Sequence, residues 1–253
     1  MQNIIRISLL LALLLALSSC IGDGKSARSG LARIAAPVTL AMARKQHEQA
    51  YFDIPTNRNW VALTIDDSPN GESTQGILNL LGESPGNPHA TFFIVGENGA
   101  GNLELLQTIQ DSSHELANHG FTTAPSSTMG LTEFIVNVEK THSVLTDFWA
   151  ENDIKWFRPS DASFTEQQAT YLQNERGYEI ALGNAYPFDY RDNNVPAAVR
   201  HIKRFVQPGA IIILHDGPEQ GAQTVKILEQ VLPWLHEEGY SIKTLSELFA
   251  SNI

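Results

Sequence analysis

Cysteine is almost absent from this chain, because only one of its 253 residues, Cys20, is a cysteine. A single cysteine excludes a disulfide framework and any zinc or iron–sulfur site built from several cysteines. Basic residues are also scarce: 17 Lys and Arg stand against 28 Asp and Glu, which gives a formal net charge of −11. Nucleic-acid binding needs clustered Lys and Arg, so this balance argues against a nucleic-acid partner.

What is present fits one globular domain. Hydrophobic residues make up 42% of the chain and charged residues 18%, with 18 Gly and 12 Pro. This composition is neither fibrous nor disordered. A chain of this length can bury one substantial core, and single domains of this size are commonly barrels or large open sheets.

The first 19 residues predict an export signal. Arg6 supplies a positive charge, and residues 7–17 form an apolar run that is too short to span a membrane. An ordinary secretory signal and a buried first helix are the alternative interpretations. Residues 17–20, Leu-Ser-Ser-Cys, resemble the lipobox of bacterial lipoproteins, which implies lipidation of Cys20.

Acyl chains on Cys20 would anchor the protein to a membrane surface without spanning the membrane. Ile21 follows where an aspartate would imply retention in the inner membrane. In a cell with two membranes we therefore expect attachment to the outer membrane, facing the periplasm. The expected organisation is a signal peptide, then the lipidated cysteine with a tether and a short helix, then one folded domain, over residues 1–19, 20–56 and 57–253.

Short apolar runs alternate with segments of helical spacing beyond residue 57. Ala210-Ile-Ile-Ile-Leu214 is the clearest run, and it predicts a buried strand. Strands alternating with helices indicate parallel βαβ units, and about seven units predict a small, irregular (β/α) barrel rather than an open sheet. We expect strands over 60–65, 90–95, 115–118, 155–157, 179–182, 210–214 and 240–244, with helices over 73–82, 103–111, 131–148, 165–176, 195–205 and 223–238.

Polar side chains follow these apolar runs. In β/α barrels the chemistry takes place in the loops after the carboxyl ends of the strands, so these side chains should converge. Each has a structural interpretation when taken alone, such as a turn for Asp66-Asp67 or a satisfied core group for a histidine. Their occurrence together favours a catalytic site formed by Asp66, Asp67, His119, Arg158, Asp189 and the pair His215-Asp216.

These residue types suit the hydrolysis of an amide or ester. One of the two adjacent aspartates can bind a divalent cation while the other accepts a proton from water, and His119 can supply an imidazole ligand. Arg158 would keep the base carboxylate ionised. His215, beside a carboxylate, would be protonated and able to donate a proton to a leaving nitrogen.

The order of these motifs resembles that of the polysaccharide deacetylases of the NodB-homology type, carbohydrate esterase family four. The resemblance extends over residues 57–248 and includes the second strand, Ala90-Thr-Phe-Phe-Ile-Val95. Thr64-Ile-Asp-Asp-Ser-Pro69 is similar to the Thr-Phe-Asp-Asp-Gly-Pro motif of the family, which implies that Asp66 is the base and Asp67 a metal ligand. The remaining motifs are matched by His114–His119, Phe157–Pro159, Asp189-Tyr190 and Leu214–Asp216.

The resemblance also implies roles for the other matched residues. His119 would be the first metal histidine, Arg158 would brace the base, and Asp189 would tune His215 as the acid. Leu214 would line the acetyl pocket. Further substrate contacts are expected from Tyr190 and Ser160, and the implied cofactor is a divalent metal, with zinc the first choice.

The sequence departs from the family at the second metal ligand. Family members place a histidine, or in some cases a carboxylate, four residues after the first metal histidine, where this chain has Thr123. A hydroxyl is a much poorer ligand than an imidazole or carboxylate for zinc-like ions. Asp161 stands near where the family has an aromatic residue, and it could instead complete the metal site.

Three functions therefore stay open. The first is a metal-dependent deacetylase that acts on an acetylated polysaccharide or oligosaccharide. The second is a hydrolase of another C–N amide bond on the same fold. The third is a non-catalytic, glycan-binding lipoprotein, which Thr123 favours and the retained Asp66, Arg158 and His215 argue against.

Overall fold

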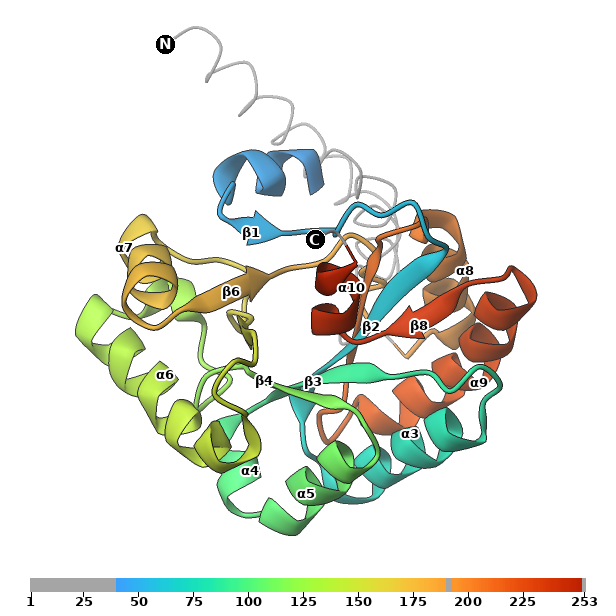
Figure 1. Cartoon of the computed structure of the whole chain (residues 1–253), viewed down its shortest axis with the longest axis horizontal. Coiled ribbons are helices and arrows are strands. Elements are labelled where there is room, and N and C mark those ends of the chain that lie inside the picture. The colour runs from blue at the N-terminus through green and yellow to red at the C-terminus, as the bar shows by residue number, and fades with distance from the viewer. Residues whose placement is uncertain (1–39, 190–192, 252–253) are drawn as a thin grey trace, which may run out of the picture. The chain divides into compact units, whose positions relative to one another are not determined.

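The computed structural model describes residues 40–189 and 193–251 (Figure 1). Residues 40–46 are helical. Strands in the described part are β1 (Ala50–Tyr51), β2 (Trp60–Ser68), β3 (Ala90–Ile94), β4 (Glu115–Asn118), β5 (Lys155–Phe157), β6 (Tyr178–Ala181), β7 (Ile211–His215) and β8 (Ser241–Lys243). Its longer helices are α3 (Gly71–Glu83), α5 (Leu103–Asp111), α6 (Leu131–Leu145), α8 (Val195–Phe205) and α9 (Gly221–Glu237). The shorter ones are α4 (Gly96–Ala100), α7 (Glu166–Thr170) and α10 (Leu245–Ala250), and a π-helical turn, Tyr171–Glu175, continues α7.

The strands form one parallel sheet that curls upon itself. Their order is β1-β6-β5-β4-β3-β2-β7, and β8 pairs with the first residues of β2. Figure 1 shows α3–α9 arranged around the outside of this sheet. The irregular (β/α) barrel predicted from alternating apolar runs is confirmed, because each crossover between neighbouring parallel strands places a helix on the outer face.

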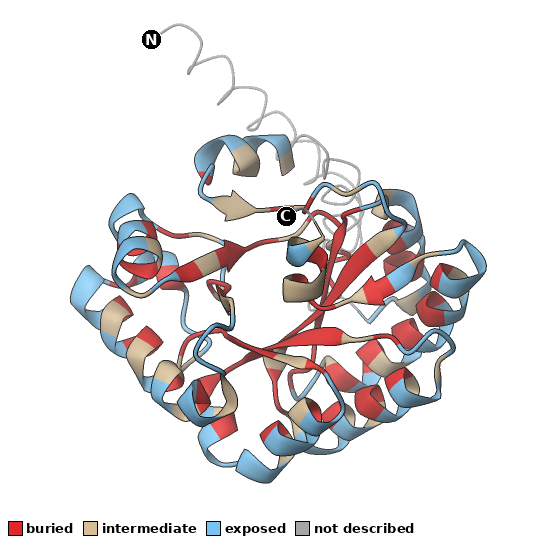
Figure 2. Ribbon diagram, viewed as in Figure 1, coloured by how far each residue is buried: buried red, intermediate tan, exposed pale blue. Residues whose placement is uncertain are grey.

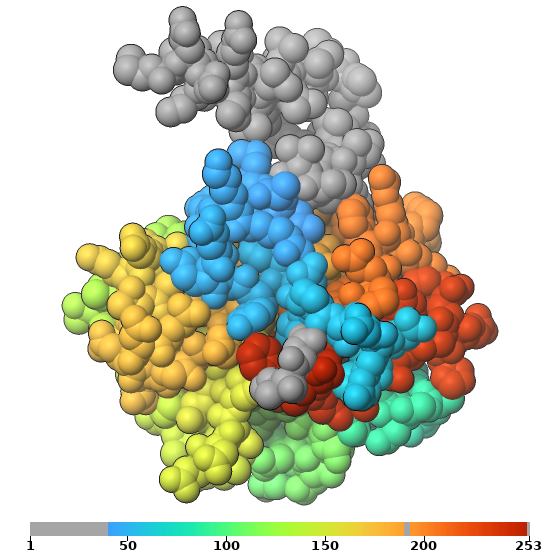
Figure 3. Space-filling view, turned by 45° about the horizontal axis from the view of Figure 1, so that its top comes forward, coloured from blue at the N-terminus to red at the C-terminus, as the bar shows by residue number. Residues whose placement is uncertain are grey.

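The segment before residue 57 takes part in the folded unit. β1 pairs with β6, and the backbone N–H of Ile54 donates to the carbonyl of Gly209, just before β7, at 2.9 Å. Figure 3 shows this blue segment between the yellow and orange parts of the surface. The compact unit begins at Ala43. Residues 50–54, at the end of the 20–56 segment that we expected to precede the folded domain, therefore belong to the barrel, because backbone pairing with two strand edges holds them there.

Alternation along β2 decides which side chains face the interior of the barrel. Val61, Leu63 and Ile65 pack outward with the helices, whereas Ala62 lies in the inner core with Phe93. Successive side chains of a strand point to opposite faces. Thr64 and Asp66 therefore share the inner side with Ala62. Figure 2 shows buried strands surrounded by helices whose outer surfaces are exposed.

The two ends of the barrel are different. α10 covers the amino ends of the strands, where Leu245 and Leu248 join the inner core with Trp156. At the carboxyl ends, buried polar residues replace the apolar core, among them Asp66, His119, Arg158, Asp189 and His215. The fold thus leaves a polar end at which chemistry is possible and closes the other end with apolar side chains.

Candidate active site

The adjacent carboxylates of Asp66 and Asp67 face the same histidine. In a regular strand two consecutive side chains would point to opposite faces. Here the pairing of β2 with β3 shifts register between Ile65 and Ser68, and Asp67 adopts a positive φ of 65°. Such a bulge redirects a side chain. As a result, Asp67 Oδ1 lies 3.7 Å and Asp66 Oδ2 lies 4.0 Å from Nε2 of His119.

Asp66 is held by a buried arginine. Nη1 of Arg158 donates to Asp66 Oδ1 at 2.5 Å, and the two residues are 2% and 4% exposed. The same guanidinium donates to Thr64 Oγ1 at 2.8 Å and to the carbonyl of Ala181 at 2.9 Å. These contacts fix the arginine, so one oxygen of Asp66 is bound and the other is directed toward His119.

Charge keeps the Asp66 carboxylate ionised. Burial alone would raise its pKa, but the Arg158 guanidinium, with His119 and His215, lowers the pKa below its ordinary value. An ionised carboxylate with one uncommitted oxygen is able to accept a proton. These are the properties that a general base requires at neutral pH.

His119 is oriented by backbone groups. Its Nδ1 lies 2.8 Å from the carbonyl oxygen of Arg158, and because a carbonyl only accepts, Nδ1 carries the proton. In the neutral ring Nε2 then presents its lone pair to the two aspartates. Ser160 Oγ donates to the carbonyl of His119 at 3.3 Å, so this predicted substrate contact also supports the backbone of the histidine.

A second buried pair stands beside the first. His215 Nδ1 lies 2.9 Å from Asp189 Oδ1, and the backbone N–H of His215 donates to Asp189 Oδ2 at 3.0 Å. Burial alone would lower the pKa of His215, but the charge and hydrogen bond of Asp189, with the charges of Asp66 and Asp67, raise it to about 9. His215 is also the register partner of Asp66 on the neighbouring strand. A protonated imidazole therefore lies next to an ionised carboxylate.

These donors suit part of a metal site. The His119 lone pair faces two carboxylate groups, and a cation between them would remove the mutual repulsion. Asp67 and His119 thus fit as ligands. Within residues 40–189 and 193–251, however, no group of three His, Cys, Asp or Glu side chains is placed to hold a metal ion. The part of the chain described here supplies two strong protein donors rather than three.

The two candidates for the third ligand are both exposed. Thr123 is exposed four residues after His119. Asp161 is also exposed, and its Oδ2 accepts a hydrogen bond from the hydroxyl of Ser127. Asp161 is therefore engaged on a neighbouring loop.

The prediction for Leu214 needs correction. Leu214 is fully buried in the outer core with the helices, because it pairs in register with the outward-facing Ile65. A side chain on that face is directed away from Thr64 and Asp66 and does not line an acetyl pocket beside them. Ile213 pairs with Thr64 and therefore has the inward position beside Arg158. Because side chains alternate along a strand, the residue two positions before His215, which is Ile213, shares its inward face, and the sequence alone contains this signal.

Other sequence predictions have different outcomes. Tyr190, Cys20 and the predicted signal peptide lie outside the described residues.

Sequence reasoning missed Thr64, whose hydroxyl donates to the carbonyl of Ile212 at 2.7 Å while accepting from Arg158. It also missed Tyr186, whose ring centroid lies 5.8 Å from that of His215. No motif marked Tyr186, because only the folded chain brings it to this place.

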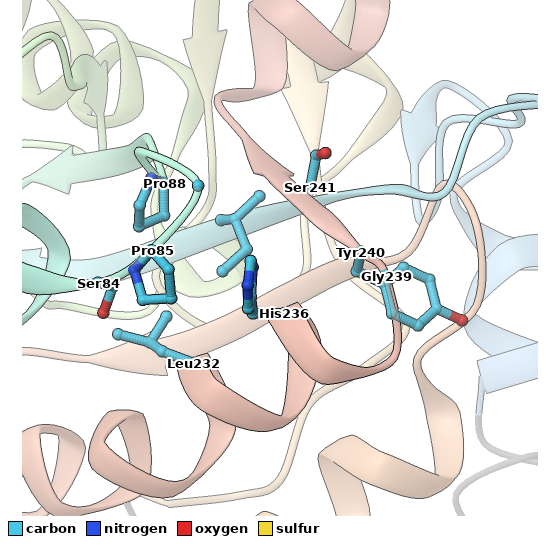
Figure 4. Close-up of a pocket in the computed structure, with 10 residues that line it drawn as sticks. Ser84, Pro85, Pro88, Leu232, His236, Gly239, Tyr240 and Ser241 are labelled. Atoms are coloured by element: carbon cyan, nitrogen blue, oxygen red, sulfur yellow. The ribbon is translucent and has the colours of Figure 1, made fainter.

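A surface hollow of about 240 Å³ lies away from these residues (Figure 4). It is formed where the loop before β3 meets the end of α9 and the start of β8, and Pro85, Pro88, Leu232, His236 and Tyr240 line it. These segments lie at the amino ends of the strands, whereas Asp66 and His215 lie at the carboxyl ends. No acidic residue lines the hollow, so it lacks the groups that the hydrolysis requires.

Comparison with known proteins identifies similar chains. The model of the polysaccharide deacetylase family matches residues 53–181. A peptidoglycan-N-acetylglucosamine deacetylase of Bacillus cereus is 29% identical over 202 residues, which cover 78% of this chain and 91% of that protein. A chitooligosaccharide deacetylase of Sinorhizobium fredii is 28% identical over 197 residues, which cover 74% of this chain and 90% of that protein.

Solved structures are similar over the same region. The Bc1960 peptidoglycan N-acetylglucosamine deacetylase has a TM-score of 0.72 at 26% identity, covering 79% of this chain and 92% of its own. A mutant CE4-family pseudoenzyme with restored activity has a TM-score of 0.68 at 25% identity, covering 77% and 69%. A family 4 acetyl xylan esterase of Clostridium thermocellum, in complex with cobalt, has a TM-score of 0.66 at 27% identity, covering 76% and 90%.

Proposed function

Because this chain belongs to the polysaccharide deacetylase family, we propose that it removes N- or O-acetyl groups from an envelope or extracellular polysaccharide. One observation carries the proposal. Asp66, which is paired with Arg158, and His215, which is paired with Asp189, are register partners on the neighbouring strands β2 and β7, so a base and an acid flank one point. The names of the similar proteins, which include peptidoglycan and chitooligosaccharide deacetylases, support a carbohydrate substrate.

The base in this proposal is Asp66. Arg158 binds Oδ1, which leaves Oδ2 to take a proton from the attacking water. The lowered pKa of Asp66 keeps it ionised at neutral pH. As the water oxygen bonds to the acetyl carbon, its proton passes to Asp66.

The acid is His215. Asp189 holds Nδ1, so the proton for the leaving group comes from the other ring nitrogen, Nε2. When the bond from the acetyl carbon to nitrogen breaks, that nitrogen takes the proton from His215 and acetate is released. Ile213, on the inward face two residues earlier, is our candidate for the contact with the acetyl methyl group.

Asp67 and His119 are the residues that would hold a divalent metal, for which zinc is the first choice. When bound, such an ion polarises a carbonyl and lowers the pKa of water. The cobalt complex of the similar acetyl xylan esterase supports metal binding in this family. Because two strong donors are in place rather than three, we expect weaker retention of metal than a site with a third imidazole would give.

A non-catalytic function is the second candidate, and two observations favour it. The third strong ligand is missing from the described residues, and a CE4-family pseudoenzyme is among the similar structures.

Metal analysis combined with acetate release from N-acetylglucosamine oligomers separates the possibilities. Bound metal with chelator-sensitive acetate release is the expected result. Amide cleavage that survives chelation would favour a different hydrolase, and glycan binding without turnover would favour the binding protein.

Replacing Thr123 with histidine should tighten zinc binding at least tenfold. An imidazole is a far better zinc ligand than a hydroxyl, and position 123 is the place where the family supplies one. Isothermal titration of the metal-free protein with zinc measures the effect, and Thr122→His is the matched control. Unchanged affinity in Thr123→His would mean that another group already completes the site.

Acetate release should fall as pH rises through about 9, because His215 must be protonated to act and its pKa lies near that value. The raised pKa also means that the His215–Asp189 pair contributes full stability below pH 6.5 and loses it as pH rises through about 9. The profile of kcat/KM between pH 6 and 10 measures the fall in acetate release. In Asp189→Asn the alkaline fall should move to lower pH, and a fall that stays in place would contradict the assignment of His215 as acid.

We further propose that the mature chain is a lipoprotein anchored through Cys20 to the outer membrane and facing the periplasm. The Leu-Ser-Ser-Cys motif at residues 17–20 supports this. Among the helices that the structure describes, none combines the length and the apolar character needed to cross a membrane. Mass spectrometry of the mature protein should find acyl chains on an N-terminal Cys20, and a free thiol at that position would contradict the anchor.

A further inference from the structure

The carboxylate of Asp216 has no part in the hydrolysis proposed above, yet it is fully buried directly after His215. Three hydroxyl groups donate to it. Ser73 Oγ lies 2.5 Å from Oδ1, Ser68 Oγ lies 3.2 Å from Oδ2, and the hydroxyl of Thr74 also donates to Oδ2. Ser68 ends β2, whereas Ser73 and Thr74 lie in the first turn of α3. One side chain thus joins the end of β7 to both segments.

These contacts fasten the backbone on both sides of Asp67. The N–H of Asp216 donates to the carbonyl of Asp66 at 2.7 Å, and its carboxylate accepts from Ser68. Asp67, between them, has a φ of 65°, a left-handed conformation that residues other than glycine adopt at a cost. Such a conformation persists when its surroundings hold it in place. Asp216 contacts both neighbours of Asp67, while Asn98 Nδ2 donates to the carbonyl of Asp67 itself at 3.4 Å.

We propose that Asp216 is a positioning residue that holds Asp67 toward His119 and fixes the β2 half of the site against the β7 half. The inference rests on the proposed function for its effect on catalysis. Its effect on the geometry of Asp67 and on zinc affinity does not depend on turnover.

The hydrogen bonds at position 216 suit a carboxylate better than an amide. A carboxylate offers only acceptors to the three hydroxyl donors, whereas an amide of the same shape would bring two N–H donors to this position. The amino end of α3, which includes Ser73 and Thr74, also favours negative charge. Burial raises the pKa of Asp216 to about 6 against the opposing effect of its hydroxyl hydrogen bonds, so the group is mostly ionised at pH 7.5.

Glu115 provides a matched control at the opposite end of the barrel. It begins β4, its Oε2 accepts from Thr91 Oγ1 at 2.6 Å, and its Oε1 accepts from the hydroxyl of Ser246. Burial raises the pKa of Glu115 to about 7. It is therefore a second shielded carboxylate that accepts hydroxyl groups, but it lies at the amino end of β4, whereas His119 follows the carboxyl end.

The test compares Asp216→Asn with Glu115→Gln in the full chain. Both variants should lower the melting temperature. Only Asp216→Asn should weaken zinc binding, by at least tenfold, and reduce kcat by a larger factor than it raises KM. In its crystal structure the distance from Asp67 Oδ1 to His119 Nε2 should exceed the 3.7 Å of the wild-type chain. The proposal would be overturned if Asp216→Asn bound zinc with an affinity within twofold of that of Glu115→Gln and its Asp67 had not moved.

Milder variants keep the test decisive if Asp216→Asn does not fold. Ser68→Ala removes the donor next to Asp67, and Ser73→Ala removes a donor five residues further along the chain. Zinc binding should weaken more in Ser68→Ala than in Ser73→Ala, and equal affinities would contradict the proposal. A wild-type chain that binds zinc but releases no acetate would refute the deacetylase function alone. If the chain binds no zinc, the crystal structure of Asp216→Asn still tests the proposal. A displaced Asp67 supports it, and an Asp67 in the wild-type position overturns it.

Discussion

Asp66→Asn is expected to reduce acetate release by about 10²–10⁴-fold, the usual contribution of a general base. The asparagine keeps the shape of the side chain, but its amide cannot take the proton of the attacking water. Arg158 loses its ionic partner, which should lower stability, but it retains its contacts with Thr64, Ala181 and Leu182, so the variant should still fold. Metal occupancy should stay close to that of the wild-type chain, because Asp67 and His119 are unchanged.

Acetate release from N-acetylglucosamine oligomers, measured beside metal content, checks this prediction. Asp111→Asn is a suitable control, since Asp111 is exposed at the end of α5, away from the site. That variant should behave as the wild-type chain does. Retained activity in Asp66→Asn would remove Asp66 as the base, and loss of metal together with activity would assign it to metal binding instead.

Arg158→Met is expected to lower the free energy of unfolding by about 3–5 kcal/mol at neutral pH. Removing one partner of a buried ion pair leaves the other charge without compensation. In the wild-type chain the lowered pKa of Asp66 contributes stability above pH 3.8, and this stability is lost as pH falls through the folded pKa. The deficit of Arg158→Met should therefore be largest near neutral pH and should shrink in acid.

Urea unfolding of single and double variants tests this account of the pair. Asp66→Asn/Arg158→Met should be more stable than Arg158→Met alone, because the double variant no longer buries an unpaired carboxylate. If the two single variants' losses in free energy of unfolding simply add in the double variant, the broken ion pair is not the cause of the instability of Arg158→Met. Arg176→Met, at a partly exposed arginine that pairs with Glu139, is the control and should cost far less.

The barrel could be predicted because its signals are local. Apolar runs such as Ala210–Leu214 and Trp60–Ile65 gave strands close to their observed positions, and the helical spacing between them gave the crossovers. β1 was missed, because two residues carry no periodic pattern and pair with β6 only after the chain has folded. The extension of β2 to Ser68 was also missed, because Asp66 and Asp67 do not look like strand residues.

Site geometry was harder to predict because it depends on departures from regular structure. A regular strand would have separated Asp66 and Asp67, and only the register shift beside Ser68 turns both toward His119. The resemblance to a family supplied their roles but not this reason. Leu214 was chosen by its place in a motif, and the alternation along β7 moves the inward position to Ile213. The restraint by Asp216 joins residues far apart in the chain, which no spacing indicates.

Zinc-edge anomalous diffraction from crystals soaked in zinc shows whether this end of the barrel binds a metal. We expect a peak bonded to Asp67 and His119, at about the 2.0–2.2 Å typical of zinc with oxygen and nitrogen ligands. The peak should lie between the Asp66–Arg158 and His215–Asp189 pairs, where base and acid can act on one acetyl group. A zinc ion bound elsewhere, or no peak at this position at saturating zinc, would rule out the proposed metal site at Asp67 and His119.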